Sequence, residues 1–313
     1  MTTRDNSYKY YIYSLIFVIF FSYVFAVGKF FFFKTDEQYF KPISYQIYTS
    51  YNEVFSQSSE IINLSSEMKE IFDRENFNLE KLVNGNFESL IIFSSLPEDF
   101  FELDLNNDKQ ELFIKVVTSI LYVENKKVLN LRKQILEWWT ENDGEIIDKI
   151  YWPEWLKNVS EDYMHNDKNI GNLLIKVDMV PTSMAVAQSI IESGWGNSRF
   201  TKEGNAIFGQ YTYDQRAGMV PASRTDSDKH LIRKFSNLSE SVESYIKNIN
   251  THSAYEKFRE HRKSLRMNGE KLIGHNLVEN LSNYSEKKNL YINDVKKIIE
   301  DYEFEKFDNI LFN

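Results

Sequence analysis

An apolar, helix-forming run at residues 184–191 leads to a single carboxylate and then ends abruptly. Glu192 follows the run, and the sequence SGWG at 193–196 follows Glu192, where glycines favour the end of a helix. An acid in the last turn meets the negative end of the helix dipole, and low exposure also favours its protonated form. A carboxylic acid that stays protonated near neutral pH can donate a proton to a leaving sugar oxygen. The alternative is an ordinary Glu beside a C-cap glycine, with Trp195 in the core.

Several short motifs follow one another in this region. The string AQSIIESGWGNSRF occupies residues 187–200, and GNAIFGQ occupies residues 204–210. These strings resemble the glucosaminidase domain of bacterial cell-wall hydrolases, in the lysozyme-like superfamily, whose pattern is AQ-x-x-x-ES-x-WG-x-S followed by N-x-FG. They resemble in particular its Bax protein branch, which shares SRF-x-x-x-GN-x-FGQ. A series of motifs in the right order is far more specific than any one of them.

The resemblance extends over roughly residues 90–300, is strong over 180–260 and is weak before 150. It implies a mainly α, lysozyme-like α+β fold, in which a helical catalytic domain carries a small β-hairpin lobe. The residues agree with this expectation. The segment 210–235 contains Gly218, Pro221 and few helix formers, which favours a short hairpin or an irregular lobe.

The chain divides into four predicted parts. Residues 1–34 form a cytoplasmic tail with a transmembrane signal anchor, and residues 35–90 form a helical or partly flexible stalk. Residues 91–165 form a helical accessory region packed on the catalytic domain, because apolar residues from Lys109 onward recur with the helical period. Residues 166–304 form the glucosaminidase catalytic domain that the resemblance implies.

The segment Tyr10–Val27 is almost wholly apolar and aromatic, and about 20 such residues span a bilayer core. Arg4 and Lys9 precede it, which suits a cytoplasmic N-terminus. We therefore expect a single-pass protein of the inner membrane, with its catalytic domain in the periplasm or cell-wall space. A cleaved signal peptide is the alternative, although Ala26 and Gly28 are a poor match to the small-residue cleavage pattern.

Composition excludes several classes of function. The net charge of −9 argues against nucleic acid as a partner. The chain has no cysteine, and its five histidines form no HExxH pair, so we expect neither a metal site nor a cofactor. The stretch 229–271 is rich in Arg and Lys; it is either a solvated helix face or a surface that meets an anionic polymer.

Glu192 is the predicted general acid of the site. The resemblance implies that it protonates the glycosidic oxygen of a GlcNAc-β-1,4-MurNAc bond in peptidoglycan. A second group then stabilises the oxocarbenium-like centre or activates water. Asp226 is the candidate for this role in the predicted β lobe, with Asp228 and Asp214 as rivals. The acetamido group of the substrate is the other candidate, and Tyr284, at the position of the family's YATD tyrosine, would then support it by a hydrogen bond.

Six further residues are predicted to bind substrate. Gln188 lies one turn before Glu192 on the same helix face, so it either orients the acid, touches sugar or makes a hydrogen bond in helix packing. Phe208 and Gln210 are expected in the cleft wall, and Tyr245 and Tyr255 are equally compatible with the core. The six are Gln188, Trp195, Phe208, Gln210, Tyr245 and Tyr255.

The predicted function is therefore cleavage of peptidoglycan glycan strands by an endo-β-N-acetylglucosaminidase. Two alternatives stay open. A lytic transglycosylase or muramidase-type enzyme also uses one catalytic Glu, but that group carries ES-x-F and a GLMQ-like element, whereas this chain has ESGWG and AIFGQ. A non-catalytic wall-binding scaffold would keep the fold without the chemistry. The sequence indicates no oligomeric state.

Overall fold

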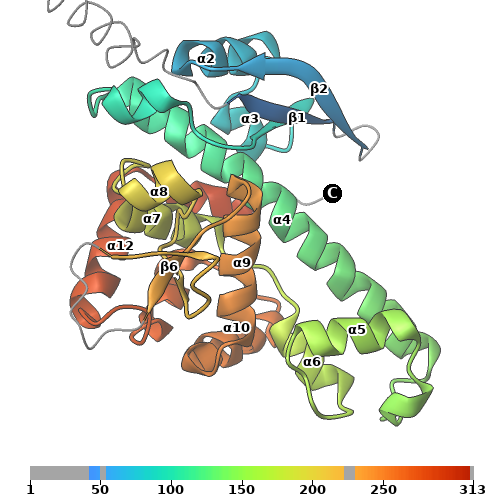
Figure 1. The fold of residues 1–313 in the computed structure, drawn as a ribbon. Coiled ribbons are helices and arrows are strands. Elements are labelled where there is room, and N and C mark those ends of the chain that lie inside the picture. Colours follow the sequence, from blue (N-terminus) through green and yellow to red (C-terminus); the bar gives the residue numbers. More distant parts are fainter. Residues whose placement is uncertain (1–41, 50–53, 222–229, 311–313) are drawn as a thin grey trace, which may run out of the picture. The chain divides into compact units, whose positions relative to one another are not determined.

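The computed structural model describes residues 42–49, 54–221 and 230–310 (Figure 1). The predicted anchor at Tyr10–Val27 lies outside this range, and so do Asp226 and Asp228. Among the helices that the structure describes, none combines the length and the hydropathy that crossing a bilayer requires. The described part of the chain is mostly helical, as expected, and it also contains two small sheets.

The first sheet has three antiparallel strands. β1 (Ile43–Thr49) lies between β2 (Val54–Ile62) and β3 (Ser89–Phe93). The helices α2 (Ser65–Arg74) and α3 (Leu79–Val83) connect β2 to β3.

The expectation of a helical or flexible stalk at 35–90 missed the three strands, although α2 and α3 within the same segment are helical, as expected. β3, with the sequence SLIIF, is buried at every position, and a short apolar run of this kind is ambiguous between strand and buried helix. β1 pairs with β3 from Tyr45–Phe93 to Thr49–Ser89. Pairing between residues 40 or more positions apart depends on tertiary contacts rather than on local pattern.

The longest helix, α4 (Asn107–Glu141), lies between this sheet and the C-terminal helices (Figure 1). The Asn106 side chain caps it by accepting a hydrogen bond from the Lys109 backbone N–H at 3.0 Å. From residue 112 to residue 126 every position is buried, because α4 packs on β3 and also on the helices α7 and α9 described below. The long helix predicted from Lys109 is therefore confirmed, and it contacts both the first sheet and the C-terminal helices.

The far end of α4 carries a separate small core. The helices α5 (Glu154–Asp162) and α6 (Ile170–Lys176) follow the 3₁₀ turn η2 (Lys149–Tyr151). They pack on this end of α4 through a buried cluster that is distinct from the main core. Its members include Ile135, Trp152, Leu156 and Leu173.

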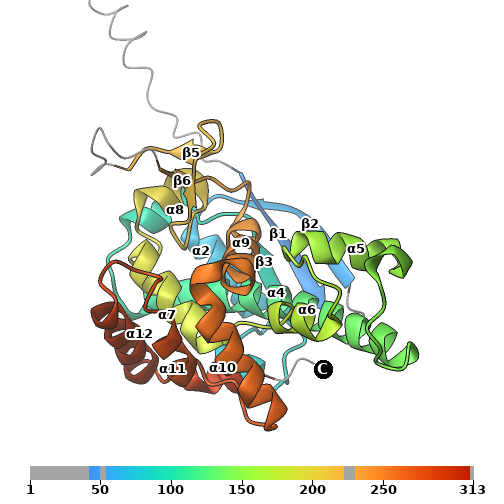
Figure 2. The same cartoon turned by 90° about the horizontal axis from the view of Figure 1, so that it is seen from below.

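The predicted catalytic part is built around α7 (Thr182–Ser193), which is buried along most of its length. It contacts α4, α11 (Gly274–Leu277), α12 (Asn289–Asp301) and the 3₁₀ helix η5 (Phe304–Asn309). The view from below shows these helices around α7 (Figure 2).

Five further helical elements lie between residues 199 and 280 in the described part of the chain. They are α8 (Arg199–Gly204), α9 (Leu238–Thr251), η3 (Ser253–Tyr255), α10 (Glu256–Met267) and η4 (Val278–Asn280).

The predicted β lobe is present as three very short strands. β4 (Tyr211–Thr212) and β5 (Gly218–Met219) both pair antiparallel with β6 (Leu231–Arg233), in the order β4-β6-β5. The segment 210–235 therefore leaves the helical pattern where its glycine and proline content predicts.

Part of the basic stretch at 229–271 is exposed, as a solvated face predicts, including Arg233, Lys234 and Lys257, whereas two of its arginines have a structural role. Arg262 is 1% exposed and donates to the carbonyls of Met179 and Ile175 at 2.8 and 2.9 Å. Arg266 forms two hydrogen bonds with the buried carboxylate of Asp178, at 2.9 and 3.1 Å. These guanidinium groups satisfy backbone carbonyls and a buried acid, so they hold α10 against the segment before α7.

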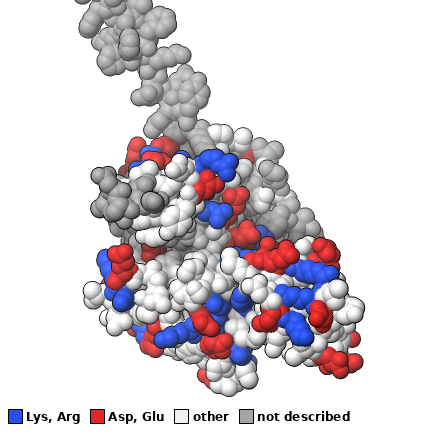
Figure 3. All heavy atoms as spheres, turned by 60° about the horizontal axis from the view of Figure 1, so that its bottom comes forward, with Lys and Arg blue, Asp and Glu red and all other residues white. Residues whose placement is uncertain are grey.

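On the face shown in Figure 3, acidic and basic side chains are interspersed. This face therefore presents no extended field of one sign to attract a charged polymer over long distances.

Candidate active site

The end of α7 holds Glu192 in place through local backbone geometry. Gly194 adopts the left-handed conformation (φ 58°), and its N–H reaches the carbonyl of Ile190. The Ser193 hydroxyl donates to the Ser189 carbonyl at 2.5 Å and accepts from the Gly196 N–H at 2.8 Å. The predicted helix end is confirmed, and it leaves the Glu192 side chain half-buried.

The surroundings of Glu192 favour its protonated form. Burial raises the pKa of the carboxyl, while a hydrogen bond from Tyr291 and the charge of Lys287 act in the opposite direction. The chain following α8 crosses close to the carboxylate at Gly209 (φ +59°), where an added methyl group would lie 3.8 Å from Glu192 Oε2. A carboxyl that is shielded from water but hydrogen-bonded can serve as a general acid.

Gln188 connects two tyrosines below this carboxyl. Tyr245 donates its hydroxyl proton to Gln188 Oε1 at 2.7 Å, and Gln188 Nε2 donates to the Tyr291 hydroxyl at 3.0 Å. Because the Tyr291 oxygen accepts from Gln188, its own proton is free to be donated to Glu192. The two hydrogen bonds therefore run in one direction, from Tyr245 through Gln188 to Tyr291, and they leave the Tyr291 proton available to Glu192.

Burial distinguishes between the expected roles of Gln188. Its side chain is 0% exposed, which favours the predicted packing and orienting roles over contact with sugar. Gln188 orients the residues around the acid.

Phe208 and Tyr245 form the floor of the site. Their rings stack at a centroid distance of 3.9 Å with planes 10° apart. Phe208 is 3% exposed and Tyr245 is 0% exposed, so neither presents a surface to substrate in this structure. The burial of Tyr245 matches its core alternative, and the two rings support the site from beneath; direct contact with sugar stays a prediction.

Tyr284 lies at the centre of the tyrosine cluster. Its ring is 5.4 Å from that of Tyr291, 5.9 Å from that of Tyr255 and 6.4 Å from that of Tyr245. Burial, together with the charge of the neighbouring Glu192, raises the pKa of the Tyr284 hydroxyl. The structure therefore brings Tyr284 and Tyr255 to the acid, and it holds Tyr284 as a neutral hydrogen-bond donor.

Two other predicted residues lie elsewhere or remain unpaired. Trp195 packs between Phe113 and Tyr302, at 6.3 and 5.1 Å, so its ring contacts α4 and the C-terminal end of the chain. This matches the core alternative for Trp195. Gln210 is half-buried, and its Oε1 accepts no hydrogen bond from the described residues.

Of the acids proposed as the second group, only Asp214 lies in the described range. It is exposed and pairs with Arg216, 3.4 Å away. No group of three or more His, Asp or Glu side chains within the described ranges is arranged to hold a metal ion.

Tyr291 is the residue that sequence reasoning missed. It lies seven positions after Tyr284, yet no role followed from its place in the sequence. A buried tyrosine at the start of an amphipathic helix gives no sign of what its hydroxyl contacts. Its partner Gln188 is 103 positions away, so only the tertiary structure identifies it.

Comparisons with known proteins agree with the resemblance. Residues 169–304 match the glucosaminidase family model, described as mannosyl-glycoprotein endo-beta-N-acetylglucosaminidase. Protein bax of Escherichia coli (strain K12) is 28% identical over 213 residues, which are 64% of this chain and 72% of that protein. The crystal structure of the catalytic domain of the autolysin Auto from Listeria monocytogenes covers 74% of this chain and 98% of that one, with 15% identity and a TM-score of 0.35. The matched family range contains Glu192 and all four tyrosines of its cluster.

Proposed function

We propose that this protein is a peptidoglycan hydrolase that cleaves the β-1,4 bond after N-acetylglucosamine, because residues 169–304 match the glucosaminidase family model. One observation carries the proposal. Glu192, the acid of the family-like motif, is a shielded carboxyl with a raised pKa that lies beside four tyrosines, Tyr245, Tyr255, Tyr284 and Tyr291.

Glu192 acts as the general acid. Burial raises the pKa of its carboxyl and so favours the protonated form, and the proton moves to the glycosidic oxygen as the bond to the anomeric carbon breaks. Tyr291 then stabilises the carboxylate that forms, because its hydroxyl donates to Glu192. Gln188 holds Tyr291 in the orientation that this donation requires.

The acetamido group of the substrate serves as the nucleophile in this proposal. Its carbonyl oxygen attacks the anomeric carbon and forms a cyclised intermediate, which water later opens. Tyr284 supports the acetamido group by a hydrogen bond; in support, its ring lies within 5.4 to 6.4 Å of three other tyrosine rings around the acid. The competing second group is Asp226, which lies outside the described residues.

Product analysis tests the proposed function. Purified peptidoglycan is incubated with the full-length protein in detergent, and the new chain ends are identified by mass spectrometry. Reducing GlcNAc ends are expected. Anhydromuramyl ends would instead indicate a lytic transglycosylase, reducing MurNAc ends a muramidase, and binding without cleavage a wall-binding scaffold.

The proposed location rests on sequence alone. The apolar segment Tyr10–Val27 supports an uncleaved anchor in the inner membrane, which would place the glucosaminidase domain on the side of its substrate.

A further inference from the structure

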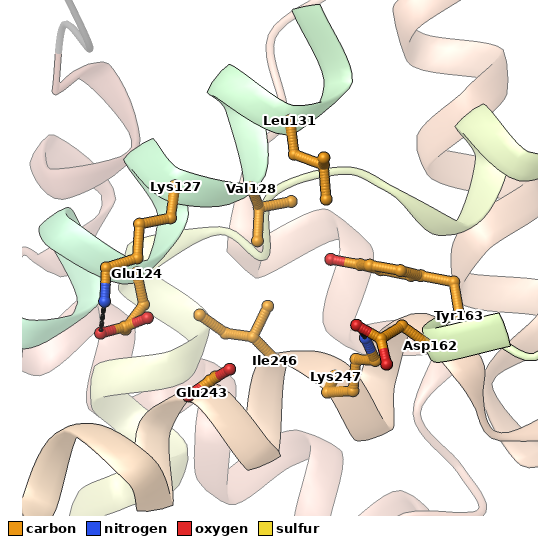
Figure 4. Close-up of a pocket in the computed structure, with 9 residues that line it drawn as sticks. All are labelled: Glu124, Lys127, Val128, Leu131, Asp162, Tyr163, Glu243, Ile246 and Lys247. Carbon is orange, nitrogen blue, oxygen red and sulfur yellow. Dashed lines mark hydrogen bonds and ion pairs between the residues drawn. The ribbon is translucent and has the colours of Figure 1, made fainter. Parts of the chain in front are cut away.

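A cavity lies between α4, α5 and α9, and none of its lining residues belongs to the Glu192 site (Figure 4). Its volume is about 170 Å³, which is smaller than the pockets that hold drug-sized ligands. Such a space suits the end of a chain rather than a whole sugar. The helix α9 contributes to both places, since Tyr245 faces Gln188 whereas Glu243 and Lys247 line the cavity.

One end of the cavity carries excess negative charge. Glu124 is 4% exposed and forms an ion pair with Lys127 at 2.8 Å. Burial raises the pKa of the Glu124 carboxyl, and the nearby charge of Glu243 raises it further. Glu243 itself forms no hydrogen bond and no ion pair with the described residues. A cation placed here would relieve the repulsion between the two carboxylates.

The opposite end offers a hydrogen-bond donor. Tyr163 is 5% exposed, and its hydroxyl points into the cavity without a hydrogen-bond partner among the described residues (Figure 4). Lys247 Nζ lies 3.8 Å from the centroid of the Tyr163 ring and 3.9 Å from the Asp162 carboxylate. This hydroxyl can donate a hydrogen bond into the cavity, and a carboxylate or carbonyl oxygen of a ligand would accept it.

The wall between the two ends is apolar. Val128, Leu131 and Ile246 line it, and in Figure 4 Ile246 lies between Glu243 and Tyr163. Three carboxylates and two ammonium groups line the cavity, so its formal charge is −1 when all are ionised. The matching ligand has an ammonium group and an acceptor oxygen attached to a short aliphatic stem.

We propose that this cavity binds the free amino-acid end of a peptide, with its ammonium group at Glu243 and a carboxylate or carbonyl oxygen at the Tyr163 hydroxyl. This inference rests on the proposed function, because the peptide stems of peptidoglycan carry such ends. The cavity then positions the glycan strand through its peptide, away from the bond that is cut.

Titration with small probes tests this inference. The probe is meso-diaminopimelic acid, which carries two amino-acid ends on an aliphatic chain, and binding to the full-length protein in detergent is followed by calorimetry or NMR. Pimelic acid has the same chain and both carboxylates but no ammonium group, and 1,5-diaminopentane has both ammonium groups but no carboxylate. We expect the diamino acid to bind at least about tenfold more tightly than pimelic acid, since a charge-assisted hydrogen bond is absent in the latter.

Two variants test which end of the cavity binds which group of the probe. Glu243→Gln should weaken binding of the diamino acid by about tenfold or more. The matched control is Glu161→Gln, which changes an exposed acid on α5 outside the cavity and should leave the affinity for the diamino acid unchanged. Tyr163→Phe keeps the ring, and it should weaken binding of the diamino acid but leave binding of 1,5-diaminopentane unchanged. Equal binding of pimelic acid, or an unchanged affinity in Glu243→Gln, would overturn the inference.

The inference and the proposed function fail separately. Glu192→Gln should bind the probe like the wild type, because Glu192 does not line this cavity. Probe binding without hydrolysis by the wild type would therefore reject only the proposed function. Hydrolysis without probe binding would reject only the cavity.

Discussion

Gln188 and Glu192, one turn apart on α7, share the hydroxyl group of Tyr291. Gln188 donates to that oxygen at 3.0 Å, which leaves the hydroxyl proton available to the Glu192 carboxyl, whose pKa a hydrogen bond from Tyr291 lowers. The arrangement fixes the direction of the Tyr291 proton, and it connects the acid to a fully buried amide.

Replacing the acid tests general acid catalysis. Glu192→Gln keeps the size of the side chain but removes the proton that the leaving oxygen needs. Turnover of peptidoglycan should fall by about 10²–10⁴-fold, as measured by release of soluble fragments, while the circular dichroism spectrum and the melting temperature stay near those of the wild type. A variant with nearly normal turnover would refute the role of Glu192.

Removing the Tyr291 hydroxyl should change the pH profile. The hydrogen bond from Tyr291 lowers the pKa of Glu192, so in Tyr291→Phe that pKa rises further. The alkaline limb of kcat/KM follows deprotonation of the acid, and it should therefore move to higher pH.

The matched control for Tyr291→Phe is Tyr302→Phe. This variant removes a hydroxyl that donates a hydrogen bond to Gln110 at 3.3 Å and not to Glu192. It should therefore leave the alkaline limb of the kcat/KM profile at the same pH. A limb that stays fixed in Tyr291→Phe would show that the hydrogen bond does not tune the acid. Tyr291→Phe should also cost about 1–3 kcal/mol of stability, because the Gln188 amide loses a buried acceptor.

Tyr284 and Asp226 distinguish two mechanisms. If the acetamido group is the nucleophile, Tyr284→Phe should be costly, because the lost hydrogen bond strengthens as charge develops. Asp226→Asn should then be mild, and a thiazoline mimic of the cyclised intermediate should inhibit. Severe loss in Asp226→Asn, without inhibition by the mimic, would instead assign the second role to Asp226.

Asp308 should make the stability of the protein depend on pH. It accepts hydrogen bonds from the Ser183 N–H at 2.9 Å, the Ser183 hydroxyl at 2.6 Å and the Gly274 N–H at 2.7 Å. Burial nevertheless raises its pKa to about 6, from 3.8. Between these two values the folded state binds more protons than the unfolded state, so the contribution of Asp308 to the free energy of unfolding decreases as pH rises.

Denaturant titrations from pH 4 to pH 7 measure this effect. The wild type should lose on the order of 2–3 kcal/mol relative to Asp308→Asn over this range, because the variant has no carboxyl to ionise. Parallel pH dependences of the two proteins would show that Asp308 ionises normally in the fold.

The N-terminal segment predicts the location of the protein. Full-length protein should sediment with membranes and retain Tyr10–Val27, and protease should degrade the glucosaminidase domain only from the outer side of the inner membrane. N-terminal sequencing that begins just after Ala26 or Gly28 would show a cleaved signal peptide.

The sequence by itself determined the local features of the candidate site. Gly194 follows Glu192, and a glycine readily adopts the left-handed conformation that ends a helix, so the position of the acid at the end of α7 follows from residues 184–196 alone. The long helix from Lys109 and the change of structure after Gln210 also follow from local periodicity and from glycine and proline content.

Only the tertiary structure decided which side chains meet at Glu192. Tyr245, Tyr284 and Tyr291 come from separate segments, and each would look like an ordinary core residue in its own helix or turn. The same holds for Arg262, which is buried although its neighbours suggest a solvated face. Burial and hydrogen-bond partners between distant segments depend on how whole elements pack, and a local pattern contains no record of that packing.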